Sequence, residues 1–224
     1  TRLGRSQTKQ AMLLEWLPGQ PLDVALPQGG VTGPAMNTVG EALARLHAQR
    51  PNGLMHYTGE MEANHARVAA DALAAICPEL TGRAMTLADR LTEQFRQLGF
   101  STCAIHGDFS ADQVLLMADD SVAILDLDNA GNGDPMADLG AFAAQLELDV
   151  LIGLLPHECI DTALHHLQVG YRNAASYHFD LDRLRTHTAA RLLRLAVEPF
   201  RQHTPDWHTL AAAILQRAEE LNYA

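Results

Sequence analysis

An abrupt change of hydrophobic period constrains the fold of this chain more than any other feature. Between residues 35 and 98, and again beyond residue 135, apolar residues recur every three or four positions, as on one face of a helix. Between these regions, short apolar runs at 103–105, 114–116 and 122–125 alternate with polar loop residues. The turn residues Asp119-Asp120-Ser121 join the last two runs, which predicts a β-hairpin. The pattern predicts an α+β fold, in which a mostly helical domain carries a small β-hairpin element.

The helical regions are divided by proline and glycine, which end helices or prevent them from continuing. Helices are expected at 35–49, 61–77, 82–98, 136–148, 157–175, 181–201 and 207–222. Near the start of the chain, the apolar residues 11–16 are followed by Leu17-Pro18-Gly19, which predicts a strand that runs into a turn. No internal repeat or low-complexity linker divides the chain.

Charge and cysteine content narrow the possible partners and the compartment. The formal net charge is −11, and an acidic surface repels phosphate backbones, so nucleic acid is not expected as a partner. The same charge would suit a cationic small substrate. The three cysteines form no CxxC pair, which is typical of reduced, mostly buried thiols. No apolar run reaches the roughly 20 residues that span a bilayer, and no signal peptide opens the chain. We therefore expect a cytoplasmic protein without a membrane partner.

Acidic and amide side chains gather around the predicted hairpin. The loop before it contains Asp108 and, five residues later, Gln113, and Asp126 follows its second apolar run. Phosphoryl transfer from a nucleotide needs one carboxylate to orient the acceptor hydroxyl, and further oxygen ligands to hold Mg²⁺ against the phosphates. Two short strands would bring the loop and Asp126 together. The spacing therefore predicts a single pocket for a magnesium-bound phosphate.

These segments resemble the aminoglycoside phosphotransferase and choline kinase family. That family has a catalytic loop of the form HGDxxxxN and a metal segment similar to IDWEDAGxGDPxxDLA. Here the loop reads HGDFSADQ over 106–113, and the second segment matches over 125–140. Residues 14–19 resemble the hinge between the two lobes of the family's kinase-like fold, and 43–47 resemble its first large-lobe helix. Helices beyond residue 150 match only in kind.

The resemblance implies a role for each matched residue of the loop and the metal segment. Asp108 would be the catalytic base, or the group that orients the acceptor hydroxyl. Asp126 would be the main Mg²⁺ ligand, helped by Gln113, and Asp128 would be a second acid close to the metal.

It also implies a supporting framework and a nucleotide site. His106 and Asp138 would hold the catalytic loop through hydrogen bonds. Backbone groups near Glu15 and Leu17 would contact the adenine of the nucleotide. Asp134, which precedes Pro135, is expected to cap a helix instead.

Two features depart from the family pattern. Gln113 replaces the usual Asn with a side chain one methylene longer, so metal binding would require a slightly more distant backbone. No Gly-rich loop or strand lysine precedes residue 14. The chain begins at Thr1 rather than Met, so we do not expect this to be the native start. We therefore expect residues 1–18 to be the end of an N-terminal lobe plus the hinge, and residues 19–224 to be the helical C-terminal lobe.

The leading hypothesis is an enzyme that transfers the γ-phosphate of ATP or GTP to a hydroxyl of a small molecule, such as an aminoglycoside, a choline-like compound or a sugar. The later helices would shape its acceptor pocket. A second hypothesis is a degenerate kinase-like binding or regulatory module without turnover. A third is a haloacid-dehalogenase-like phosphatase, because Asp126-Leu127-Asp128 forms a DxD sequence after a strand. Ala130 departs from that motif.

Overall fold

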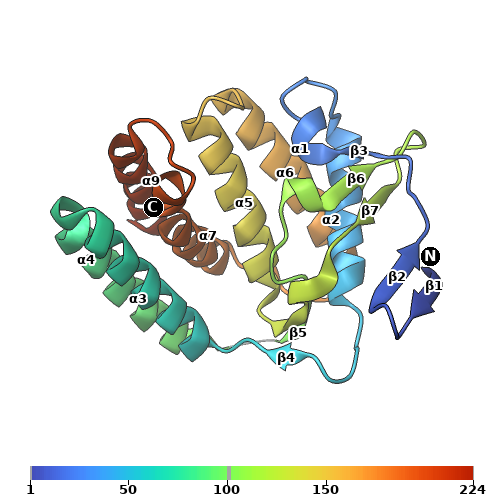
Figure 1. The fold of residues 1–224 in the computed structure, drawn as a ribbon, viewed down its shortest axis with the longest axis horizontal. Helices are drawn as coiled ribbons and strands as arrows, with labels where there is room; N and C mark the ends of the chain where they lie inside the picture. Colours follow the sequence, from blue (N-terminus) through green and yellow to red (C-terminus); the bar gives the residue numbers. More distant parts are fainter. Residues whose placement is uncertain (1, 100–101, 224) are drawn as a thin grey trace.

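The computed structural model describes residues 2–99 and 102–223, with the side chain of Arg2 excepted. Helices dominate it, and Figure 1 shows most of them packed on one another to one side of a group of short strands. The longer helices are α2 (Gly33–His47), α3 (Gly59–Ile76), α4 (Thr81–Gln97), α5 (Pro135–Leu151), α6 (His157–Ala174), α7 (Leu181–Leu195) and α9 (Trp207–Tyr223). Two single turns, α1 (Leu22–Ala25) and α8 (Glu198–Arg201), complete the α-helices of the described residues.

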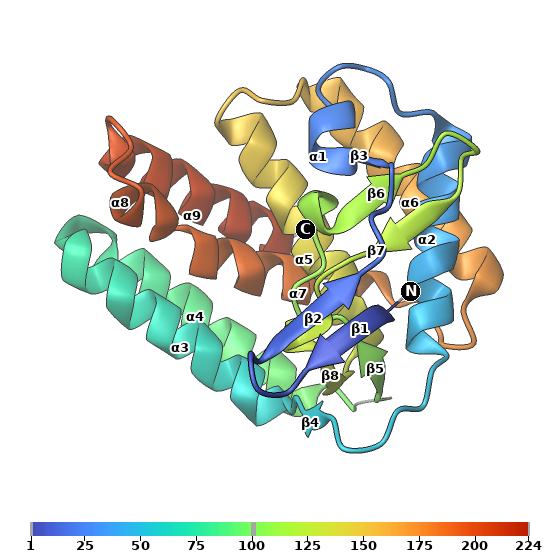
Figure 2. The same ribbon diagram turned by 45° about the vertical axis from the view of Figure 1, so that its right-hand side comes forward.

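The strands form three small sheets. The strands are β1 (Arg2–Ser6), β2 (Ala11–Leu14), β3 (Gln20–Pro21), β4 (Met55–His56), β5 (Cys103–Ile105), β6 (Val114–Leu116), β7 (Val122–Ile124) and β8 (Gly131–Gly133). β1 and β2 pair alone, β6 lies between β3 and β7, and β8 lies between β4 and β5. Figure 2 shows the β1–β2 ribbon in front of the other strands. The predicted hairpin is confirmed as β6–β7, with Val114 opposite Ile124.

The sheet around β8 was not expected from the sequence, since its strand is Gly131-Asn132-Gly133. β8 pairs in parallel with β4 and antiparallel with β5. A Cβ on Gly131 would lie 2.2 Å from Cε2 of Tyr57, so only glycine allows this close approach. Glycine is a poor strand former, so the sequence of this segment does not predict a strand. Glycine is needed here because of a contact between residues far apart in the chain.

The hydrophobic core consists of two clusters. One is built from α3, α4, α7 and α9, and the other from α1, α2, α5, α6 and the hairpin. α5 and α7 pack directly on each other and join the two parts. In Figure 1, α5 lies between the α3–α4 pair and the hairpin. Side chains at the N-terminal end of α5 can therefore reach both parts.

Most predicted helices are confirmed, but one is not continuous. The expected helix at 181–201 ends at Leu195, and α8 begins at Glu198. Pro199 has no backbone N–H to donate to the carbonyl of Leu195, and its ring would clash with that carbonyl, so the helix breaks before it. The predicted strand at 11–16 is also shorter, because β2 ends at Leu14.

The thiols and the helices can be compared with the expectations from the sequence. Cys77 and Cys103 are buried, Cys159 is half-buried, and all three are free thiols. Burial raises the pKa of Cys77 to about 11 and that of Cys103 to about 12, so both are protonated at neutral pH. No helix within the described residues combines the length and the apolar character that crossing a membrane requires.

Candidate functional site

One buried carboxylate, that of Asp138, holds the loop that follows β5. Its Oδ2 atom accepts a hydrogen bond of 2.7 Å from the backbone N–H of His106, and its Oδ1 accepts one of 2.9 Å from Gly107. Oδ2 also lies 2.9 Å from Nε2 of His47, whose Nδ1 lies 2.8 Å from the hydroxyl of Tyr171. Asp138 therefore links the loop to α2 and, through Tyr171, to α6.

A second set of contacts joins the loop to the segment after the hairpin. Nε2 of His106 lies 2.7 Å from the carbonyl oxygen of Leu125. The backbone N–H of Leu125 donates a bond of 2.8 Å to the carbonyl of Gln113. Leu125 is thus held by both ends of the 106–113 loop, and Asp126 is the next residue. The structure brings the loop and Asp126 together, as the sequence predicts.

The closeness of these two segments depends on Gly107. Its φ of 84° is in the left-handed region, and a Cβ there would lie 2.2 Å from the carbonyl oxygen of Asn129. No L side chain fits without moving the segment that carries Asp126 and Asp128. Glycine is therefore required at position 107 for two reasons, the left-handed backbone conformation and the close approach of Asn129.

Asp126 is a strained residue at the end of the hairpin. Its φ of 55° and ψ of 70° are left-handed, and its carboxylate accepts a long hydrogen bond of 3.5 Å from the N–H of Asp128. It begins a single 3-10 turn, Leu127–Asn129. A non-glycine residue in this region costs about 1–3 kcal/mol. Such strain is common where a side chain must be aimed at a ligand.

The oxygen atoms of Asp126, Asp128 and Gln113 are the donors that could hold a divalent cation. The two aspartates are exposed and Gln113 is half-buried. Nε2 of Gln113 donates a 2.9 Å bond to Asp112, which leaves its Oε1 as the acceptor of the amide. Across the described residues, no three His, Cys, Asp or Glu side chains form a metal-binding group. Carboxylate and amide oxygens are the ligand types that suit Mg²⁺, which protein sites bind through one or two carboxylates completed by phosphate and water.

Asp108 has an ion-pair partner that the sequence did not predict. Its Oδ1 lies 2.6 Å from Nη2 of Arg191, on α7, and its side chain remains 41% exposed. The backbone N–H of Asp108 donates to Nδ1 of His106 at 3.3 Å. The only sequence signal for Arg191 was its spacing from Arg194, one helical turn apart in the predicted helix.

Asp108 and Arg191 line a pocket of about 360 Å³. β4, β5, α3, α5 and α7 supply its walls, and Asn129 contributes from the segment after the hairpin. Its other charged or titratable lining residues are Tyr57, Glu62, His65, Asp138, His187 and Arg194. Asp126, Asp128 and Gln113 do not line it, so this pocket is not the single pocket that the spacing predicted for these residues and Asp108.

The pKa shifts in this pocket show how its charges interact. Burial alone would raise the pKa of Glu62, but His65, His187 and Arg194 stabilise its charged form, so that the pKa is lowered. The pKa of Arg194 is lowered, first by the loss of water around it and second by repulsion from Arg191. Glu62 is therefore ionised at neutral pH, and the two guanidinium groups repel each other.

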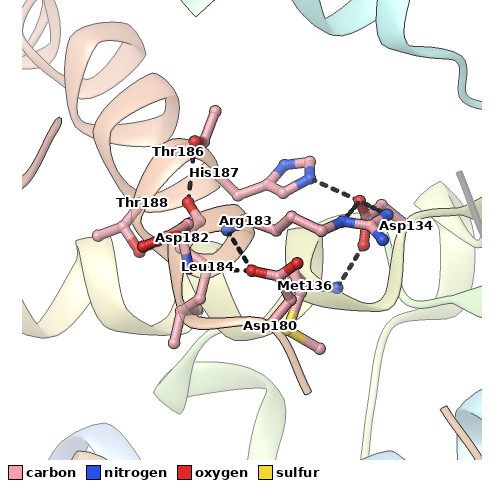
Figure 3. Close-up of polar contacts among 9 residues, drawn as sticks. All are labelled: Asp134, Met136, Asp180, Asp182, Arg183, Leu184, Thr186, His187 and Thr188. Atoms are coloured by element: carbon pink, nitrogen blue, oxygen red, sulfur yellow. Dashed lines mark hydrogen bonds and ion pairs between the residues drawn. The ribbon is translucent and has the colours of Figure 1, made fainter. Parts of the chain in front are cut away.

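Asp134 fixes α7 against the start of α5, as Figure 3 shows. Its Oδ1 caps α5 by accepting a 2.9 Å bond from the N–H of Met136, which confirms the predicted cap. Its Oδ2 pairs with Arg183 and lies 3.3 Å from Nε2 of His187. Burial would raise the pKa of Asp134, but these cationic and N–H partners outweigh it and the pKa is lowered. The helix that carries Arg191 is thereby positioned from the same turn that holds the loop.

The predicted hinge residues lie away from this pocket. Glu15 is exposed and Leu17 is half-buried, just after β2. Neither lines the pocket beside Asp108. The chain then passes close to β6, since a Cβ on Gly19 would lie 2.9 Å from Cβ of Leu115. The hinge segment therefore adjoins the hairpin.

Comparison with known proteins identifies the family and the fold. The profile of the Phosphotransferase enzyme family matches residues 2–185. No curated protein matches the chain by sequence. A choline/ethanolamine kinase family protein from Mesorhizobium loti is similar in structure, with a TM-score of 0.71 and 16% identity, over 100% of this chain and 74% of that one.

Two further solved structures share the fold. A glucosamine kinase has a TM-score of 0.65 and 24% identity over 90% of this chain and 58% of its own. An aminoglycoside phosphotransferase from Streptomyces rimosus has a TM-score of 0.54 and 21% identity over 79% of this chain and 66% of its own. The chain thus spans between 58% and 74% of these three proteins. Its fold is kinase-like with the helical lobe dominant. The family match includes Asp126-Leu127-Asp128, the segment that suggested a haloacid-dehalogenase-like phosphatase, and so contradicts that alternative. By the match over residues 2–185, this chain belongs to the Phosphotransferase enzyme family.

Proposed function

We propose that this chain is a Mg²⁺-dependent O-phosphotransferase that moves the γ-phosphate of ATP or GTP to a hydroxyl of a small molecule. One observation carries the proposal. Leu125 is hydrogen-bonded both to His106 and to Gln113, which sets Asp126 beside the loop that bears Asp108. The loop that bears Asp108 and Gln113 is thereby joined to the segment that begins at Asp126, and phosphoryl transfer uses acidic and amide groups of this kind for different tasks.

In this proposal Asp108 orients the acceptor hydroxyl. The hydroxyl oxygen forms a bond to the γ-phosphorus, the bond from that phosphorus to the β–γ bridging oxygen breaks, and the nucleoside diphosphate leaves. The hydroxyl proton passes to Asp108, whose Oδ2 has no hydrogen-bond partner among the described residues. Oδ1 stays on Arg191. The pocket beside Asp108 binds the acceptor.

Asp126 and Gln113 hold Mg²⁺, with Asp128 close by. The bound ion, in this family of reactions, neutralises charge on the phosphates. His106 and Asp138 take no part in the transfer and keep the loop in place. Backbone groups near Glu15 and Leu17 contact the base of the nucleotide. Residues 1–18 are the end of an N-terminal lobe and the hinge, and 19–224 form the C-terminal lobe.

The test is Mg²⁺-dependent production of ADP or GDP against a panel of hydroxyl compounds, with wild type, Asp108→Asn and Asp120→Asn. Asp120→Asn makes the same change of charge in the hairpin turn, where its φ of 62° is also tolerated by Asn. We expect transfer by wild type and Asp120→Asn, and a loss of about a hundredfold or more in Asp108→Asn. Equal rates in all three proteins would show that Asp108 is not the base. Nucleotide binding without transfer to any compound would favour the degenerate module.

A further inference from the structure

Two arginines one turn apart on α7 face the space beside Asp108. Arg191 and Arg194 both line the 360 Å³ pocket, and both also line a neighbouring groove of about 510 Å³ that α3 and the α7–α8 segment enclose. His65 of α3 is the third residue common to the two spaces. Residues three apart on a helix project from the same side. Arg191, Arg194 and His65 therefore form a junction between pocket and groove, which we call the arginine junction.

The donors of the arginine junction are mostly unused. Nη2 of Arg191 binds Asp108, and its other N–H groups have no partner among residues 2–99 and 102–223. Arg194 is attracted by Glu62 and Asp108 but forms no ion pair or hydrogen bond within that part of the chain. Nδ1 of His65 is buried without a hydrogen-bond partner there, 3.8 Å from Glu62. A guanidinium offers five N–H donors in a planar fork that matches a carboxylate or a phosphate.

The neighbouring acids do not meet this need. Asp138 already accepts bonds from His106, Gly107 and His47. Glu62 lies next to His65, and its lowered pKa reflects the cations around it. Among the residues that the structure describes, Asp108 is the one direct partner of Arg191. When Asp108 takes the hydroxyl proton it becomes neutral, and Arg191 then needs another anion.

We propose that the acceptor carries a carboxylate or phosphate group, bound between Arg191 and Arg194, in addition to the hydroxyl that meets Asp108. This inference rests on the proposed function and names the substrate class of that site. Because Arg191 contacts Asp108 directly, the anionic group and the reacting hydroxyl are separated by one carboxylate and one guanidinium group in contact with each other. That separation corresponds to a hydroxyl and an acid group on a short carbon chain. Longer acceptors extend into the groove.

The acidic net charge of the whole molecule does not oppose this assignment. At physiological ionic strength, charges separated by more than about 8 Å are largely screened. The groups in direct contact with a ligand therefore decide its charge. The sequence-based expectation of a cationic substrate followed from the average over the surface, whereas the arginine junction is local.

Ligand binding without nucleotide tests the inference. Glycerate, 4-hydroxybutyrate, gluconate and glycerol 3-phosphate are compared with glycerol, 1,4-butanediol and sorbitol, and with the cations choline and glucosamine. Calorimetry measures Kd for wild type, Arg194→Gln, Arg194→Lys and Arg185→Gln. Arg185 lies on the same helix, pairs with Asp182 and does not line the pocket, so it is the matched loss of charge. Glycerate against glycerol 3-phosphate separates carboxylate from phosphate recognition.

We expect at least one anionic compound to bind about tenfold or more tightly than its neutral counterpart. Arg194→Gln should abolish that preference, Arg194→Lys should keep part of it, and Arg185→Gln should keep all of it. Tighter binding of neutral or cationic compounds, a preference that survives Arg194→Gln, or no binding of any anion would overturn the inference. Transfer to neutral or cationic acceptors alone would overturn it and leave the proposed function intact. Binding of anions through Arg194 with no transfer to any acceptor would support an anion site and contradict the proposed function.

Discussion

The backbone N–H of His106 donates a 2.7 Å hydrogen bond to Oδ2 of Asp138, a buried carboxylate on the first turn of α5. The same oxygen lies 2.9 Å from His47 of α2. One side chain therefore sets the distance between the candidate catalytic loop and two helices. Much of the geometry of the site depends on this contact.

The first prediction concerns Asp138→Asn. An amide supplies one acceptor oxygen where the carboxylate supplies two, so at least one N–H of the loop loses its partner. We expect a loss of about 3–5 kcal/mol in the free energy of unfolding, as when a buried charged partner is removed. Misplacement of the loop by about 1 Å should also lower kcat by about a hundredfold.

Denaturant unfolding and a transfer assay measure both effects. The control is Asp149→Asn on the same helix. Burial raises the pKa of Asp149, so its charge is unfavourable in the folded state, and neutral Asn should leave stability unchanged or slightly higher. If the two variants behave alike, Asp138 is not the support of the loop.

The second prediction concerns Gly107→Ala, for which Gly53→Ala is a matched control. Both glycines have a left-handed φ, 84° and 80°, but a Cβ on Gly53 meets no atom within 4 Å, whereas one on Gly107 overlaps Asn129. The control should cost only about 1–2 kcal/mol of conformational strain. Gly107→Ala should cost more and should also abolish transfer, since the segment bearing Asp126 must move.

Unfolding free energies and transfer rates are measured for both variants. The difference between the two variants gives the effect of the contact between position 107 and Asn129. Similar values for both would mean that the loop and the segment after the hairpin do not need to touch.

The third prediction is a pH dependence that originates at Asp134. Its folded pKa lies below the ordinary value of 3.8, so its contribution to stability is complete above about pH 4 and is lost as the pH falls through the lower, folded value. Asp134→Asn leaves Arg183 and His187 without their anion, and should lower the free energy of unfolding by about 3 kcal/mol at pH 7.

The difference between wild type and Asp134→Asn should shrink as the pH is lowered from 5 to 3, where wild type loses the same interaction. Urea unfolding at three pH values measures this. Asp119→Asn, at an exposed turn, serves as the control and should leave stability nearly unchanged. If the difference in unfolding free energy between wild type and Asp134→Asn stays constant down to pH 3, the pH dependence does not originate at Asp134.

The fourth prediction concerns the proposed metal ligands. Asp126→Asn removes a negative oxygen donor and should raise the Mg²⁺ concentration required for half-maximal transfer by at least tenfold. Gln113→Asn shortens the amide by one methylene, toward the residue typical of the family, and should retain activity. Mg²⁺ titration of the transfer rate compares them, and chelation should abolish transfer in all. If Asp126→Asn requires the same Mg²⁺ concentration as wild type, Asp126 is not a metal ligand.

Local chemistry made much of this protein readable from its sequence. The hairpin and the helices followed from hydrophobic period and from turn residues, which act over a few neighbouring positions. The loop at 106–113 and the approach of Asp126 followed from motif spacing. The break before Pro199 was also present in the sequence, but a continuous apolar pattern concealed it.

What the sequence could not show are the contacts between residues far apart in the chain. β8 is a strand because it pairs with β4 and β5, where Tyr57 packs against Gly131, and strand propensity does not predict such pairing. Arg191 meets Asp108 across 83 positions, and Arg183 and His187 converge on Asp134. These pairings depend on how α7 packs against α5, which is decided by the shape of the whole core.

The sequence by itself thus determined the class of fold, the loop and the acids that are candidates for phosphoryl transfer, because these depend on residue type and spacing. Only the tertiary structure decided which cations face those acids, because an ion pair requires two side chains within a few ångströms, and that distance is set by packing. The distribution of charge in the pocket beside Asp108 is therefore a property of the folded chain, and the net charge of −11 did not reveal it.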